Sequence, residues 1–141
     1  MFKLVFTVLG LLGVTLASIP ADTATINTFL DAPSAIFVLS WAGLFAAAGC
    51  KDFSTFFNPM VDVHNKLANF SEGAVLAGWV GFLLGFIYLL AQGEMSWYDP
   101  SNTEKDFYAA NAVMLVTIFH GYLIKGVCLL ISKNLASQET S

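Results

Sequence analysis

The chain has 141 residues, of which 57% are hydrophobic and only 11% are charged. A domain of this size has too small a core to hide so many apolar side chains, so the composition excludes an ordinary soluble protein. The formal net charge is −4, and the six cations are lysines scattered along the chain. This distribution excludes a nucleic-acid-binding surface, which requires clustered cations that displace counterions. We therefore expect much of the surface to face lipid.

Four apolar runs predict an all-α, polytopic membrane protein with a single transmembrane domain over residues 1–141. The predicted transmembrane helices cover about 4–20, 35–50, 73–92 and 108–131. The third and fourth are long enough to cross about 30 Å of hydrocarbon at about 1.5 Å per residue. The first two fall just under the usual length, so flanking residues or a thinned bilayer would have to complete them.

The first two runs have local signals at their ends. The first has the charged start, short apolar core and small-residue end of a secretory signal peptide, but we expect it to be retained as a short transmembrane helix. The second follows a segment in which Asp31 or Ser34 can cap the coming helix. We expect the polar segment 51–72 to form a loop that carries a short surface helix around residues 60–70.

The lysines indicate the orientation in the membrane. Four crossings would place both termini on one side, together with Lys3, Lys51, Lys66 and Lys133, and would place Lys105 on the other side. Because lysine-rich segments stay in the cytoplasm, we expect both termini to be cytoplasmic. We predict a multi-pass protein of the cytoplasmic (inner) membrane.

Small residues recur at helical spacing in every predicted transmembrane helix. Helices that associate in lipid use such residues to bring their backbones close together. The stripes of the first three helices comprise Gly10, Gly13 and Ala17; Ser40, Gly43, Ala47 and Cys50; and Gly78, Gly81 and Gly85. In the fourth helix, one face carries Ala110, Met114, Thr117, Gly121, Lys125, Cys128 and Ser132. The glycines that we predict for helix packing are Gly78, Gly81, Gly85 and Gly121. So many stripes favour a homo-oligomer or a larger complex, although they could also serve only to hold one chain together.

Two ionisable residues lie inside the fourth predicted transmembrane helix. His120 lies near its middle, and Lys125 lies more than one turn further towards the cytoplasm. A charge at this depth is costly unless it meets water, a partner or a route to the interface. For Lys125, snorkelling to the inner headgroups and a functional role both stay open. For His120, the alternatives are a hydrogen bond to a neighbouring helix and proton transfer.

The sequence shows no constellation for catalysis or cofactor binding. It contains no evident nucleophile with its base, no phosphate-binding glycine loop and no pair of membrane carboxylates. The only other histidine, His64, belongs to the expected loop and cannot share a haem with His120. Cys50 and Cys128 lie in separate runs rather than in a metal-binding pair. We therefore predict no enzyme activity, no cofactor and no metal site.

Three stretches, Ile26–Val38, Gly81–Ile87 and Ala112–Gly121, share a pattern with one family of membrane proteins. The first, INTFLDAPSAIFV, resembles the entry to the second transmembrane helix of MotA-type flagellar stator subunits. The second, GFLLGFI, is similar to the G-T-x-x-G-L stretch in the third helix of the MotA/TolQ/ExbB proton-channel family. The third, AVMLVTIFHG, is similar to the A-x-A-L-x-T-T-x-x-G stretch of the fourth helix. The order of the stretches also agrees with that family.

The resemblance implies a pentameric ring of four-span subunits around a dimer of single-span partners. In that family, a membrane aspartate of the partner carries protons or sodium ions past threonines of the ring. Thr117 matches the first threonine of the fourth-helix pair, whereas Ile118 replaces the second and Phe82 replaces the third-helix threonine. The resemblance and the buried charges together make Thr117, His120 and Lys125 the candidate ion pathway.

The leading functional prediction is a small integral membrane subunit that resembles ion-driven stator and proton-channel proteins. It would form a homo-oligomeric ring in lipid around a single-span partner. The segment 51–72 is too short for the cytoplasmic domain through which flagellar stators transmit torque, so we do not expect torque generation. The alternative is a non-conducting structural subunit of a larger membrane complex.

Overall fold

The computed structural model describes residues 2–17, 30–50, 52–58, 61–91 and 103–139. In these residues the regular structure is helical throughout, which confirms the all-α prediction. The helices are α1 (Phe2–Ala17), α3 (Ala32–Ala48), α4 (Phe53–Phe56), α5 (Val63–Ala91) and α6 (Thr103–Glu139). Lys51 and residues 26–29 of the first family-like stretch lie outside the described residues.

The start of α3 agrees with the local signal in the sequence. A side-chain oxygen of Asp31 accepts a hydrogen bond from the backbone N–H of Ser34, at 2.9 Å. This bond satisfies one of the N–H groups that the first turn of a helix leaves free. Asp31 is therefore the capping residue, and the helix covers 32–48 rather than the predicted 35–50.

Among the described residues, two helices rather than the four predicted are long and apolar enough to cross a membrane. They are α5, with 29 residues, and the segment Asn111–Gln138 of α6. The helices α1 and α3 are apolar but have only 16 and 17 residues. At about 1.5 Å per residue they reach about 25 Å, which is less than the hydrocarbon thickness of about 30 Å. The prediction of four transmembrane helices is corrected accordingly: in the described residues, two helices have the length to cross.

Both long helices extend beyond the apolar runs that predicted them. The helix α5 begins at Val63 rather than at 73, and α6 covers 103–139 rather than 108–131. Hydropathy marks only the apolar part of a helix, whereas backbone hydrogen bonds continue through polar residues. Most of the expected surface helix around 60–70 is therefore the first part of α5.

Lys66 connects α4 to α5. Its ammonium group donates hydrogen bonds to the backbone carbonyls of Thr55 and Asn58, the second at 2.6 Å. The Thr55 carbonyl belongs to α4 and the Asn58 carbonyl follows it, and each also accepts a backbone N–H, from Asn58 and Val61 respectively. The short helix is thereby held against the beginning of α5.

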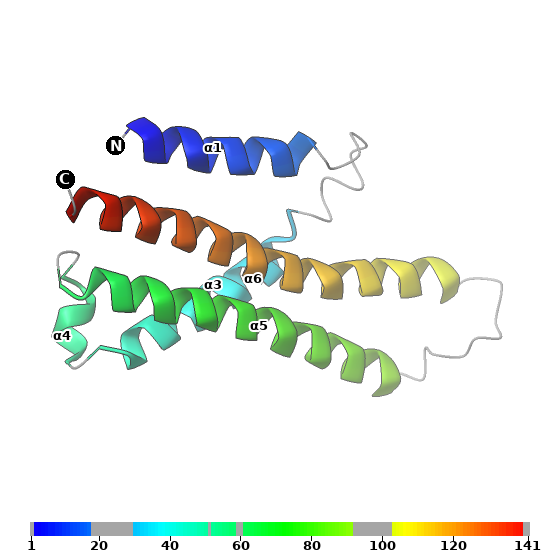
Figure 1. Ribbon diagram of the computed structural model, residues 1–141. Helices are drawn as coiled ribbons and strands as arrows, with labels where there is room; N and C mark the ends of the chain where they lie inside the picture. Colours follow the sequence, from blue (N-terminus) through cyan, green and yellow to red (C-terminus); the bar gives the residue numbers. More distant parts are fainter. Residues whose placement is uncertain (1, 18–29, 51, 59–60, 92–102, 140–141) are drawn as a thin grey trace.

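The helices are arranged around one long antiparallel pair (Figure 1). The helices α5 and α6 run side by side, α3 packs against α5, and α1 lies along the second half of α6. The start of α1, the end of α6 and the short α4 all lie at one end of the molecule. Lys66 and Lys133 belong to this end, whereas Lys105 belongs to the first turns of α6 at the opposite end.

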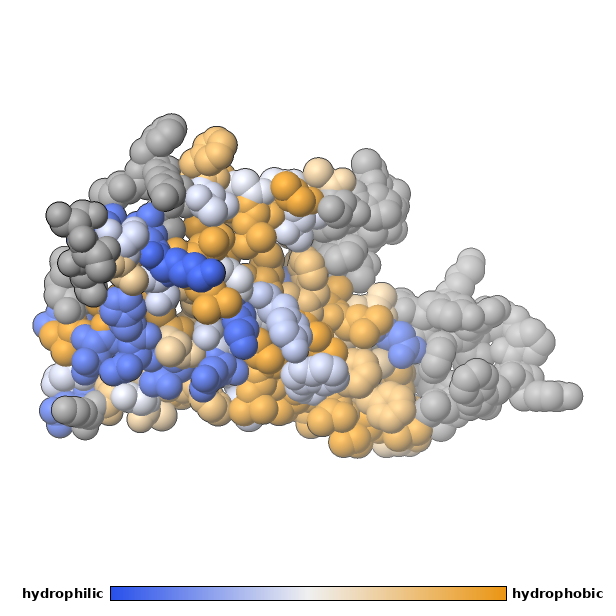
Figure 2. Space-filling view, viewed as in Figure 1, coloured by the Kyte–Doolittle hydropathy of each residue, from blue (hydrophilic) through white to orange (hydrophobic). Residues whose placement is uncertain are grey.

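The core is small and lies mainly between α3 and α5. Val38 and Ala42 of α3 and Ala74 and Ala77 of α5 are fully buried. In the most apolar 18-residue stretches of α5 and α6, only 22% and 28% of the residues are buried. Hydrophilic residues gather at the end that contains α4, and apolar residues cover the surface further along the helices (Figure 2). Core helices of soluble proteins, in contrast, are mostly buried.

Candidate functional site

The closest approach between α5 and α6 follows a line of residues that we call the glycine seam. It consists of Gly78, Gly81 and Gly85 of α5 and Met114, Thr117 and Gly121 of α6. A Cβ added at Gly78 would lie 2.9 Å from the carbonyl oxygen of Thr117. A Cβ added at Gly121 would lie 2.5 Å from the carbonyl oxygen of Ala74. Both contacts are with backbone, so a larger residue at either position would push the helices apart.

Side chains of α6 fill the space over the other two glycines of α5. A Cβ added at Gly81 would lie 3.2 Å from the Cβ of Thr117, and one added at Gly85 would overlap the side chain of Met114. Thr117 and Met114 are both buried. The four glycines singled out in the sequence for helix packing thus lie at one interface within the chain.

The hydroxyl group of Thr117 is engaged inside the glycine seam. Its Oγ1 lies 3.1 Å from the carbonyl oxygen of Gly78, across the interface, and 2.6 Å from that of Met114, one turn earlier in α6. The residue is only 6% exposed. A hydroxyl has one proton, which it shares between these two acceptors or donates to one at a time. The backbone of the same chain therefore satisfies this group as a donor.

The three residues predicted for an ion pathway do not share one face of α6. An α-helix turns about 100° per residue, so His120 and Lys125 lie about 140° apart around its axis. Nδ1 of His120 is buried, whereas the side chain of Lys125 is half-buried. Of the three, only Thr117 belongs to the glycine seam. In the described part of the chain, the structure does not bring these residues together into one polar path.

The small-residue stripes on α1 and α3 have different surroundings. A Cβ added at Gly10, Gly13 or Gly43 would meet no atom of the described residues within 4 Å. The buried residues of α3 are Ser34, Val38, Ala42 and Ala46. This buried face was missed, because the predicted stripe of α3 begins at Ser40, which is exposed. The four-residue spacing of Val38, Ala42 and Ala46 is the signal that could have found it.

The geometry of the glycine seam is that of close helix packing with one hydrogen bond between helices. Comparisons of the chain with protein-family models, with curated proteins and with solved structures find no match. Function is therefore inferred from the residues and their arrangement.

Proposed function

We propose that the chain is a small integral membrane subunit whose α5–α6 pair is a non-conducting scaffold within a larger membrane complex. The apolar surface of the long helices supports the membrane location. On α5 alone, Leu76, Leu83, Leu84 and Ile87 are between 44% and 59% exposed. An apolar surface of this extent is unfavourable in water and is typical of a membrane or protein interface.

The hydrogen bonding of Thr117 is the observation that supports a scaffold over an ion pathway. Conduction needs oxygen atoms that face water or a partner, where they can replace the hydration shell of a moving ion. The Thr117 oxygen instead lies between α5 and α6, next to the carbonyl oxygen of Gly78. Interhelical hydrogen bonds and small residues at close contacts are the usual means of helix association in lipid. In this proposal Thr117 stabilises the helix pair.

A second candidate is an ion-conducting, homo-oligomeric ring around a single-span partner. The three stretches similar to the MotA/TolQ/ExbB family favour it, because Thr117 occupies a position at which that family has a threonine. The open positions at Gly10, Gly13 and Gly43 also leave surfaces on which further helices can pack closely. In this candidate, an ion must reach the lone pairs of the Thr117 oxygen, which belongs to a residue only 6% exposed between α5 and α6.

Proton flux into liposomes separates the two candidates. The purified protein is reconstituted together with any single-span protein that copurifies with it, and wild type is compared with Thr117→Val. Valine nearly keeps the shape of threonine and removes the hydroxyl, so it tests chemistry rather than packing. We expect both proteins to give the flux of empty liposomes. A wild-type flux above this level that falls in Thr117→Val, with unchanged assembly by native mass spectrometry, would overturn the scaffold proposal.

A further inference from the structure

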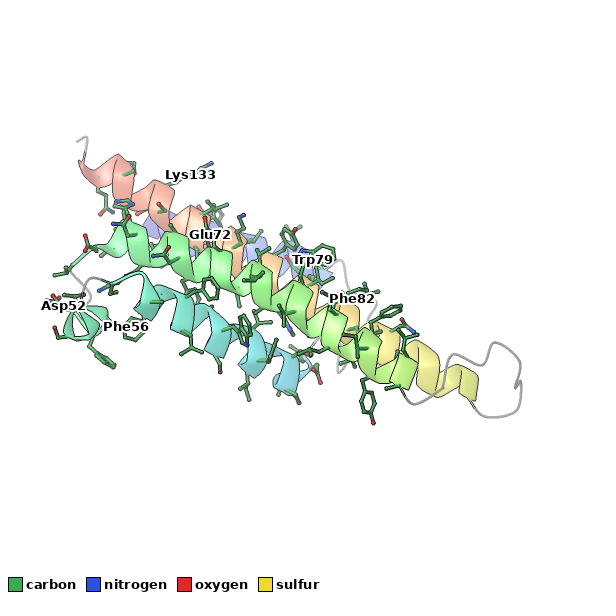
Figure 3. The ribbon with its side chains drawn as sticks, turned by 90° about the horizontal axis from the view of Figure 1, so that it is seen from below. Asp52, Phe56, Glu72, Trp79, Phe82 and Lys133 are labelled. Atoms are coloured by element: carbon green, nitrogen blue, oxygen red, sulfur yellow. The ribbon has the colours of Figure 1, made fainter. Side chains whose placement is uncertain are left out.

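Glu72 lies on the outward face of α5, one turn before a row of large apolar side chains. Its carboxylate is exposed, and Leu76, Trp79 and Leu83 follow at helical spacing and are 44%, 46% and 52% exposed. Glu72 is nine residues from Gly81, which places it about 180° around the helix from the glycine seam. Figure 3 shows Glu72 and Trp79 on this helix. The face is therefore not covered by α6 of the same chain.

Lys125 of α6 lies at nearly the same depth in the molecule as Glu72. Gly121 packs against the backbone of Ala74 and Val75, which fixes the register of the two antiparallel helices. In this register, Glu72 lies opposite the position two or three residues after Gly121. Lys125 lies four residues after Gly121, so it is offset from Glu72 by one or two residues. At about 1.5 Å per residue, the two charged residues differ in depth by about 3 Å or less.

Neither charge is neutralised within the described residues. There, Glu72 and Lys125 form no ion pair and no hydrogen bond through their side chains. Lys125 is half-buried; it lies about 40° around α6 from Gly121 of the glycine seam and about 60° from Tyr122, which is 52% exposed. A charge beside lipid-facing apolar residues is stabilised by an opposite charge at its own depth. The two faces therefore have complementary charges at matching depth.

We infer that Glu72 of one copy pairs with Lys125 of a second copy, so that the outward face of α5 docks against the exposed side of α6. The inference rests on the proposed membrane location. Copies of one sequence share one orientation in the membrane, because the same lysine distribution directs each of them. Lys125 of a neighbour then arrives at the depth of Glu72 without a shift along the membrane normal.

Disulfide trapping between differently tagged copies tests this interface. Both versions lack the native cysteines through Cys50→Ser and Cys128→Ala; one carries Glu72→Cys and the other carries Lys125→Cys. After co-expression and oxidation in the membrane, we expect a disulfide-linked dimer of mixed size. The matched control replaces Lys125→Cys by Lys133→Cys, which is exposed but lies about 12 Å further along α6. We expect loss of the mixed dimer in the control, and no difference between the two pairs would overturn the inference.

Exchange of the two charges provides a second test. The single variants Glu72→Lys and Lys125→Glu should lose the oligomer in native mass spectrometry, and the double variant should regain it. If Lys125 only snorkels to lipid headgroups, Glu72→Lys leaves the oligomer intact, and the inference is overturned. Release of the wild-type protein from membranes by carbonate would contradict the proposed membrane location itself. If the wild-type protein stays in the membrane but its copies do not form the Glu72–Lys125 contact, only the proposed pairing is contradicted.

Discussion

Small residues recur at helical spacing in α5 and α6 and also in α1 and α3, but the glycines among them have different surroundings in the two regions. A Cβ at Gly78 or Gly121 would meet backbone of the facing helix at 2.9 Å and 2.5 Å. A Cβ at Gly13 or Gly43 would meet no atom of the described residues within 4 Å. The comparison teaches that a small-residue stripe permits close approach without requiring it. Which helix occupies the stripe depends on the rest of the packing, and an open stripe stays available to another chain.

Gly121→Leu should have the largest effect on stability among the variants that test this comparison. The new side chain would overlap the backbone at Ala74, so we expect the α5–α6 pair to lose about 3 kcal/mol of unfolding free energy, as in overpacked cores. Thermal unfolding of the purified protein in detergent, followed by circular dichroism, measures the loss. The matched control Gly43→Leu enters open space and should leave the unfolding curve of the monomer nearly unchanged. Equal destabilisation by the two substitutions would contradict the distinction between the regions.

An intermediate effect is expected at the start of α3. Asp31→Ala removes the side-chain acceptor for the Ser34 N–H and should cost about 1 kcal/mol. Hydrogen exchange of the first turn of α3 should become faster, while exchange at the glycine seam should not change. Asp31→Asn keeps an acceptor at this position and should restore slow exchange. Faster exchange spread over all helices would show that the cap supports more than α3.

The smallest effect on stability is expected for a substitution of Thr117 inside the glycine seam. Thr117→Val removes the interhelical hydrogen bond to Gly78 and should cost about 0.6 kcal/mol, the average for such bonds in a membrane protein. Thr117→Ser keeps the hydroxyl and serves as the control for its chemistry. Both variants are compared with wild type in the same unfolding measurement. A Thr117→Val protein that is more stable than wild type would mean that the hydroxyl serves a purpose other than holding the helices together.

Features that depend on neighbouring residues were accessible from the sequence. The cap at Asp31 needs only a residue three positions away, and it is one of the two caps that the pattern offered. The all-helical fold also follows from the long apolar runs. Helix length was less accessible, because α5 continues back to Val63 through residues that hydropathy assigns to a loop. The shorter helices α1 and α3 are apolar enough to be predicted as transmembrane helices, but they are too short to count as candidate spans.

Features that depend on the register between helices could not be predicted from the sequence. The spacing of Gly78, Gly81 and Gly85 predicts a contact face, but it does not say which helix fills it. The role of the Thr117 hydroxyl depends on a carbonyl 39 residues earlier in the chain. Its match to a threonine of the MotA/TolQ/ExbB family suggested an ion ligand, and only the structure supplied the carbonyl to which its hydroxyl donates. The matching depth of Glu72 and Lys125 required the same register.

The most direct test of the central claim, that the glycine seam lies within one chain, is a disulfide across it. The chain carries Gly81→Cys and Thr117→Cys and lacks its native cysteines. A Cβ at Gly81 would lie 3.2 Å from that of Thr117, near the separation of about 3.8 Å found in disulfides. We predict that oxidation in the membrane gives an internal disulfide, with the protein remaining monomeric on a non-reducing denaturing gel and protected from thiol alkylation. Disulfide-linked dimers as the only product would contradict this, because the seam would then lie between copies.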